Sequence, residues 1–328
     1  MLKLLNFADY SPIIEGDRRG PEQLSAFLQK HRLDGVELIQ HNRFMPWDPQ
    51  RIPAEQIKGL HMQFWPTWLD FWNGNSEEVL RQFSTREAYM EYYGGETRDA
   101  LVEYYRKEIK IAQKIGVKYI VFHVSHVQVE HCFSYQFSYS DEDVVEAFIQ
   151  MLNEVLMGVD AEFDLLLENQ WWPGLTLLDR QIAHRLLRGI RYPRTGFVLD
   201  IGHMMNTNPQ LKSEEEAAEY ILEVLHHLGD IASFIKGIHL NSSLSGEYVK
   251  KVIKAGKSLE AGTFFERYDK ACWHIAEIDQ HKPFLHASIR QVIRQVSPSY
   301  LVYEFRADSL QDLERYIKLQ NDALDEYR

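Results

Sequence analysis

Eight short apolar runs recur along the 328-residue chain, and their spacing limits the folds that it can adopt. Most of them are continuous rather than alternating in polarity, as expected for strands buried on both faces of a parallel sheet. The runs cover residues 2–8, 35–40, 57–64, 117–125, 164–170, 196–203, 234–241 and 299–305. Segments with helical periodicity lie between them, and a final one follows at 308–327. This order predicts an α/β fold, a (β/α)8 TIM barrel, with an open doubly wound sheet as the alternative.

The chain is predicted to form a single domain over residues 1–328. Its length would accommodate two average domains, but the sequence contains no convincing linker, low-complexity tract or repeat. Two connections, at 65–96 and 242–298, exceed the usual length of a loop. In a barrel we expect both to lie over the catalytic face, where the carboxyl ends of the strands meet.

The composition argues against several classes of protein. A formal charge of −12 at pH 7 would repel a nucleic acid backbone, so a nucleic acid partner is not expected. Only two cysteines occur, which argues against a disulfide scaffold, and no run approaches the length of a membrane span. The first residues do not resemble a secretory signal. We therefore expect a cytoplasmic protein with a small polar substrate, and leave open whether it forms a homo-oligomer.

Side chains that can bind metals fall near the carboxyl ends of the predicted strands. Strands three to eight each carry at least one, and the set comprises His61, His123, Glu168, Asp200 with His203, His239 and Glu304. In a barrel these ends converge on one mouth. A lone histidine on an apolar strand is more often a hydrogen-bonded core residue, whereas a buried glutamate needs a cation or several donors to stay ionised. Taken together, the six strands predict a metal site.

These residues resemble a known family, the xylose isomerase-like TIM barrels, which include sugar isomerases, epimerases and AP endonuclease family 2. The most specific element is LDIGHMMN at 199–206, which is similar to the Asp-x-x-His after strand six of the family; LLLEN, GIHLN and LVYEF support it. In isomerase and epimerase members, one divalent metal is bound by the residues that match Glu168, Asp200, His239 and Glu304. Mn²⁺, Zn²⁺, Mg²⁺ and Co²⁺ all tolerate such a ligand set.

The endonuclease branch implies a larger centre, because its members hold three zinc ions with nine ligands. Besides the four residues above, the matching positions are His61, His123, His203, Asp279 and His281. The chain also departs from that branch, since VFHVS at 121–125 lacks its His-Pro-Gly and HLNSSLS at 239–245 lacks its Asp-Ser-Lys. We therefore expect one firmly bound ion, with the five additional residues lining a polar substrate pocket; up to three zinc ions are the alternative.

The resemblance implies a metal-dependent isomerase or epimerase of carbohydrate metabolism that acts on a small polyhydroxylated substrate. The metal would stabilise an enediolate, while Glu168 and Glu304 serve as the catalytic acid and base. The candidate substrate-binding residues are Trp65, Trp172 and Arg306. The spacing of Trp65 with its neighbouring tryptophans also fits one face of a helix packed on the barrel rim. The alternatives are a multinuclear zinc phosphoesterase of the AP endonuclease type and a barrel that binds a ligand without turnover.

Overall fold

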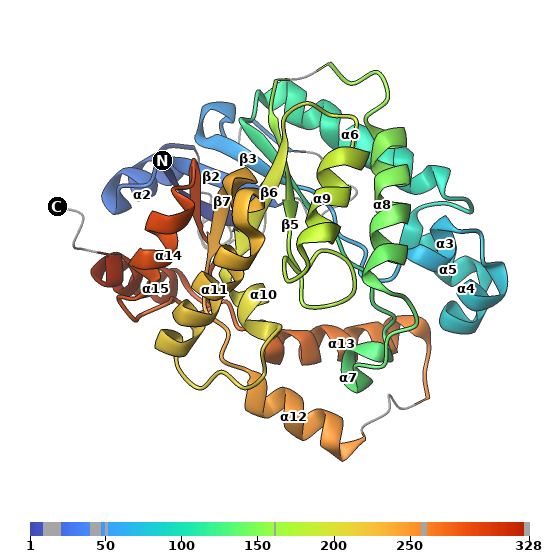
Figure 1. The fold of residues 1–328 in the computed structure, drawn as a ribbon. Helices are drawn as coiled ribbons and strands as arrows, with labels where there is room; N and C mark the ends of the chain where they lie inside the picture. The colour runs from blue at the N-terminus through green and yellow to red at the C-terminus, as the bar shows by residue number, and fades with distance from the viewer. Residues whose placement is uncertain (9–20, 40–46, 50–51, 161, 257–260, 325–328) are drawn as a thin grey trace.

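The computed structural model describes residues 1–8, 21–39, 47–49, 52–160, 162–256 and 261–324. Eight parallel strands close into one barrel in the order β1 to β8, which confirms the (β/α)8 prediction and excludes the open sheet (Figure 1). The strands are β1 (Leu2–Ala8), β2 (Gly35–Ile39), β3 (Ile57–His61), β4 (Tyr119–His123), β5 (Asp164–Glu168), β6 (Thr195–Asp200), β7 (Ile235–Leu240) and β8 (Tyr300–Tyr303). Each strand coincides with one of the eight apolar runs.

Helices surround the barrel and cover its outer surface (Figure 1). They are α2 (Pro21–His31), α6 (Asp99–Ile115), α8 (Asp141–Val155), α9 (Arg180–Gly189), α11 (Glu214–Leu228), α14 (Ile289–Val296) and α15 (Leu310–Leu324). Helix α6 illustrates why these segments fold as they do, because it buries Leu101, Ile109 and Ala112 along one face at helical spacing. It ends at Gly116, whose φ of +77° suits a glycine C-cap. None of the described helices combines the length and apolar composition that a membrane span requires.

The apolar runs are continuous because both faces of each strand are buried. Leu4, Val121 and Leu166 belong to a small cluster of strand residues that fills the inside of the barrel. Their chain neighbours Leu5 and Leu165 belong to the large cluster between the barrel and its helices. Successive side chains along a strand point to opposite faces, so one strand contributes to both clusters.

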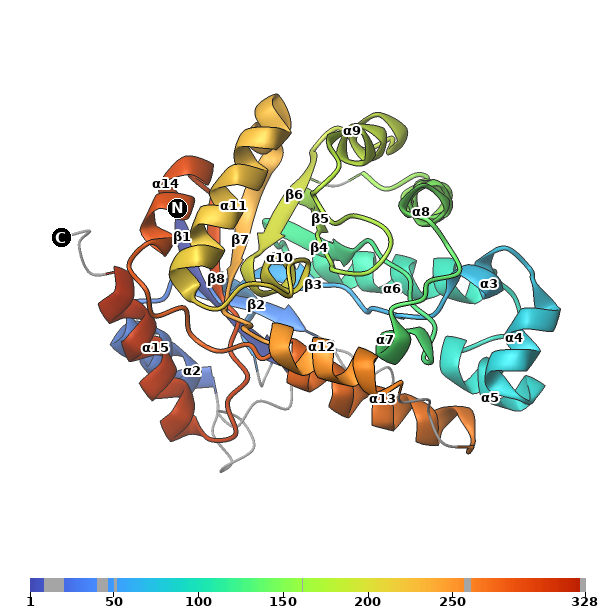
Figure 2. The same cartoon turned by 60° about the horizontal axis from the view of Figure 1, so that its bottom comes forward.

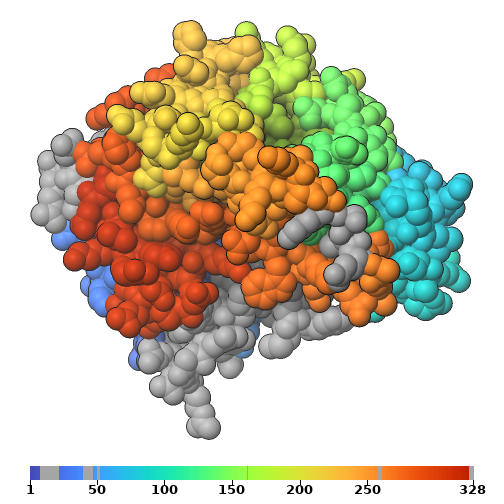
Figure 3. All heavy atoms as spheres, turned by 90° about the horizontal axis from the view of Figure 1, so that it is seen from below, coloured from blue at the N-terminus to red at the C-terminus, as the bar shows by residue number. Residues whose placement is uncertain are grey.

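The two long connections contain short helices of their own. The segment 65–96 forms α3 (Leu69–Trp72), α4 (Ser76–Phe83) and α5 (Arg86–Tyr93), which lie together beside α8 (Figure 1). The connection from β7 to β8 forms α12 (Gly246–Ala255) and α13 (Phe264–Ile278) before α14. Figure 2 shows α12 and α13 across the end of the barrel at which the strands finish, together with α7 (His131–Ser134) and α10 (Ile201–Asn206), and Figure 3 shows the orange surface of the segment with α12 and α13 on that side.

Candidate metal centre

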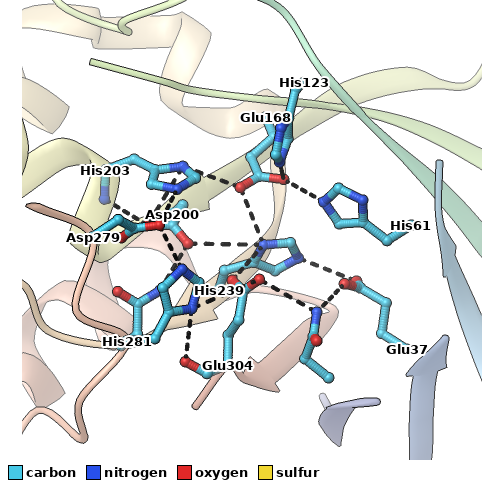
Figure 4. A network of polar contacts seen from close by, with 12 residues as sticks. Glu37, His61, His123, Glu168, Asp200, His203, His239, Asp279, His281 and Glu304 are labelled. Carbon is cyan, nitrogen blue, oxygen red and sulfur yellow. Dashed lines mark hydrogen bonds and ion pairs between the residues drawn. The ribbon is translucent and has the colours of Figure 1, made fainter. Parts of the chain in front are cut away.

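The last inward-facing position of several strands carries a polar side chain. Val121 and Leu166 point into the barrel, and two residues later on the same faces come His123 and Glu168. The same spacing holds in β6 and β8. The register of β4 with β5 sets His123 beside Glu168 (Figure 4), so the polar side chains come one layer after the apolar residues that fill the barrel.

Glu168 is fully buried and contacts four histidines. Its Oε2 atom lies 3.0 Å from His61 Nε2 and 3.1 Å from His123 Nε2. Its Oε1 atom lies 3.2 Å from His203 Nδ1 and 3.4 Å from His239 Nδ1. The two oxygens therefore face different sets of side chains, and Glu168 belongs to two groups of ligand-type residues at once.

A group of four buried residues consists of Glu168, Asp200, His239 and Glu304, each of which offers an atom within 4.8 Å of the others. His239 Nδ1 lies 3.1 Å from Glu304 Oε2 and 3.9 Å from Asp200 Oδ2. Among the described residues, Glu168 Oε1, His239 Nδ1 and Glu304 Oε2 are buried atoms that make no hydrogen bond. Buried polar atoms without hydrogen bonds are costly. A divalent cation between them would satisfy all three, so this group fits a metal.

A third group contains His203, Asp279 and His281. Asp279 Oδ2 lies 3.2 Å from His203 Nε2 and 2.5 Å from His281 Nε2. Although 40 residues separate Asp279 from the histidine of β7, a pair of backbone hydrogen bonds between Ser242 and Lys282 closes the connection. The end of α13 therefore returns to the barrel mouth beside β7.

The Asp-x-x-His spacing has a local structural cause. Asp200 is the N-cap of α10, and its Oδ1 atom accepts a hydrogen bond of 2.6 Å from the backbone N–H of His203. Its Oδ2 atom accepts one of 2.8 Å from Asn241 Nδ2. One short turn thereby places a carboxylate and an imidazole at the same mouth, and Asn241 holds the carboxylate in place.

The charges of this centre, taken without a metal, favour protonated side chains. Burial opposes protonation of His239, but the surrounding carboxylates outweigh burial and raise its pKa well above the usual range. Burial likewise opposes protonation of His281, but the nearby carboxylates, above all Asp279, outweigh burial and raise its pKa to about 10. Burial also raises the pKa of Asp200 to about 8. These protons take the place of positive charge that metal ions would bring, so metal binding would release them.

The three predicted substrate-binding residues lie in different surroundings. Trp65 is buried in the large core, and its indole N–H donates to the carbonyl oxygen of Tyr92 at 3.1 Å. Trp172 lies in a separate apolar cluster with its neighbour Trp171, whose ring centroid is 5.0 Å from that of His203. Arg306 is exposed, and its backbone N–H donates to the carbonyl oxygen of His281. Trp172 and Arg306 are thus near the centre, whereas Trp65 is part of the packing.

One residue of this network was missed in the sequence analysis. Glu37 is fully buried in the middle of β2, and its Oε2 atom lies 3.1 Å from His239 Nε2 (Figure 4). The available signal was a single charged residue inside the apolar run GVELI. A buried carboxylate in such a run requires donors of its own.

The comparisons with known proteins agree with this fold. The model of a family described as xylose isomerase-like TIM barrel matches residues 25–296. The solved structures that resemble the chain include the IolI protein with a zinc atom, at 13% identity, TM-score 0.53 and coverage of 100% of this chain and 99% of that one. Endonuclease IV from Thermus thermophilus has 15% identity and a TM-score of 0.50, with 99% and 100% covered. The 3-keto-D-glucoside 4-epimerase YcjR from E. coli has 12% identity and a TM-score of 0.50, with 98% of each chain covered. No curated protein matches the chain.

Proposed function

This chain belongs to the xylose isomerase-like TIM barrel family, and from that premise we propose that it is a multinuclear metal-dependent enzyme that hydrolyses phosphate esters. The observation that carries the proposal is the third group, in which Asp279 contacts both His203 and His281. A single-ion isomerase does not need these residues as ligands. With the two groups that share Glu168, they offer three adjacent positions for divalent ions.

Nine side chains would hold the ions. The three sets are His61, His123 and Glu168; Glu168, Asp200, His239 and Glu304; and His203, Asp279 and His281. Mixed imidazole and carboxylate ligands suit zinc. When bound, such ions would polarise the phosphoryl oxygens and lower the pKa of the water molecule that attacks phosphorus.

The chain itself would supply the spacing of the ions and the contacts to the substrate. Glu168 fixes the distance between two of the groups, because one oxygen faces each. Arg306 is our candidate for binding the phosphate, since it is exposed and its backbone is bonded to that of His281. The placement of α12 and α13 across the barrel mouth (Figure 3) and the net charge of −12 favour a small phosphate ester over a long nucleic acid.

The positions of Glu168 and Glu304 support a role as metal ligands. One oxygen of each lies within 3.4 Å of His239 Nδ1, and the two belong to a group of atoms within 4.8 Å of one another. One oxygen of each carboxylate therefore converges on the same position beside His239.

A second candidate is the single-ion sugar isomerase or epimerase expected from the sequence. It is favoured by the hydrogen-bonding pattern, because Asp279 already satisfies His203 and His281 without an ion. The group that contains Glu168, His239 and Glu304 is then the one that requires a cation most. The two candidates differ in the number of ions that they need.

Metal content and activity together test the proposal. We would measure zinc per chain in protein purified without chelators, and assay hydrolysis of bis(p-nitrophenyl) phosphate before and after chelation. In parallel, a panel of ketoses would be incubated in D2O to detect proton exchange at carbon. Nearly three ions and chelator-sensitive hydrolysis are expected. One ion together with deuterium incorporation into a ketose would overturn the phosphoesterase and establish the second candidate.

A further inference from the structure

Glu37 is a buried carboxylate that the proposed reaction does not use. It lies one layer deeper in the barrel than the nine ligand-type residues, because the register pairs it with Gly59, two positions before His61. Both Glu37 and His239 have no exposed surface. An ionised carboxylate at this depth requires several hydrogen-bond donors.

Neutral donors already engage both oxygens of Glu37. The hydroxyl of Tyr119 donates to Oε2 at 2.8 Å, and the side-chain amide of Asn6 donates to Oε1 at 3.2 Å. The third contact is with His239 Nε2, at 3.1 Å from Oε2. Because a carboxylate oxygen accepts hydrogen bonds, this contact requires the hydrogen of the imidazole to be on Nε2.

The barrel interior is shaped to hold this arrangement. A Cβ atom at Gly59 would lie only 2.2 Å from Cζ of Tyr119, so the glycine makes room for the ring whose hydroxyl reaches Glu37. On its other side the Tyr119 ring stacks on Tyr300, with 4.2 Å between centroids. Glu37 therefore meets a fixed partner and has little freedom to turn away from His239.

We propose that Glu37 is a positioning residue that fixes the ring orientation and tautomer of His239. With the hydrogen held on Nε2, the lone pair of Nδ1 would be available to a cation held between this nitrogen and the oxygens of Glu168 and Glu304, which lie 3.4 and 3.1 Å from it. Carboxylates that hydrogen-bond the far nitrogen of a metal-binding histidine orient it and increase its basicity. This inference rests on the metal centre proposed above.

The competing interpretation is that Glu37 is itself a ligand. Glu37, His61 and His239 also offer atoms within 4.8 Å of one another. However, Glu37 already accepts hydrogen bonds from Tyr119 and Asn6, and His61 Nε2 lies 3.0 Å from Glu168. The existing contacts therefore favour an orienting role.

Zinc binding by wild type, Glu37→Gln and a matched control tests this role. The control is Asp164→Asn, which alters another largely buried carboxylate. Asp164 lies at the opposite end of the barrel and accepts hydrogen bonds from Tyr300, Lys236 and Arg194. Dissociation constants for Zn²⁺ would be obtained by competition with a chromophoric chelator. We expect Glu37→Gln to raise the Zn²⁺ dissociation constant of the site that contains His239 about 10–100-fold. Asp164→Asn should leave this dissociation constant unchanged. In zinc-loaded wild type with ¹⁵N-labelled histidine, NMR should place the hydrogen of His239 on Nε2.

Any other result of these zinc-binding and NMR experiments would refute one specific claim. A hydrogen on Nδ1 of His239, or wild-type zinc affinity in a folded Glu37→Gln protein, would refute the positioning role alone. Loss of one whole ion from Glu37→Gln without a change at the others would make Glu37 a ligand. If wild type binds no zinc, the metal centre itself fails. Should Glu37→Gln not fold, as judged by circular dichroism, the NMR measurement on wild type decides.

Discussion

The shared carboxylate of Glu168 leads to a quantitative prediction about metal content. Glu168→Gln removes a charged ligand from two of the three groups, because Oε2 faces His61 and His123 while Oε1 faces His239. Asp279→Asn removes one from the third group only. If wild type holds three ions, Glu168→Gln should retain about one and Asp279→Asn about two.

The same difference should appear in thermal stability. An ion present at about 100 times its dissociation constant stabilises the folded state by about 2.7 kcal/mol, so losing two costs about 5 kcal/mol and losing one about half of that. With about 2.1 cal/mol/K of unfolding entropy per residue, the 328 residues convert these losses to a Tm lower by about 8 °C and about 4 °C.

The assay combines elemental analysis with calorimetry. Each protein would be dialysed against a zinc buffer of defined free concentration, its zinc counted by mass spectrometry, and its Tm measured before and after EDTA. The differences in Tm between the variants and wild type should shrink strongly once EDTA removes the metal. Equal zinc content in Glu168→Gln and Asp279→Asn, or three ions in either, would refute the bridging role of Glu168.

Three further predictions concern residues around the centre. Burial lowers the pKa of His126 from 6.5 to about 4; the charge of Asp70 opposes this shift, and the charge of His131 adds to it. The stabilisation by the neutral ring is therefore complete above pH 6.5, is lost as the pH falls toward 4, and amounts to about 3 kcal/mol. Urea unfolding at pH 7 and 4.5 should show this loss of unfolding free energy in wild type but not in His126→Gln. Gly202→Ala would place a Cβ atom 1.9 Å from Asn241 Oδ1, which should cost about 1–3 kcal/mol and weaken zinc binding; unchanged unfolding and zinc titrations would contradict this. Arg306→Ala should raise KM for a phosphate ester about tenfold, with kcat less affected, because about 1.4 kcal/mol of binding would be lost; an unaltered KM would remove Arg306 from the substrate site.

The architecture and much of the candidate site could be predicted from local sequence features. Continuous apolar runs such as YIVF in β4 are typical of strands buried on both faces, and their number and alternation with helices favour a closed barrel over an open sheet. Glu168 was identifiable because a carboxylate at the end of such a run is costly in isolation. Asp200 and His203 were identifiable because they lie near the end of an apolar run and match the Asp-x-x-His of the family, and the structure explains their spacing by the N-cap of α10.

Other parts of the centre depend on contacts between distant segments. Asp279 and His281 meet His203 only because backbone hydrogen bonds between Ser242 and Lys282 close a long connection, and no local pattern encodes that closure. The spacing of the tryptophans predicted a helix face for Trp65, and this was wrong, because α3 begins only at Leu69; the burial of Trp65 in the core depends on what surrounds it.

Periodicity along the chain is enough to predict which segments form strands, and the residues at the predicted strand ends then include the imidazoles and carboxylates of the site. In contrast, the contacts of Glu168 with two groups at once, and of Glu37 with His239 across the barrel at 3.1 Å, arise only in the folded barrel. The physical reason is that distances between side chains on different strands depend on the register of the closed barrel. That register is a property of all eight strands together.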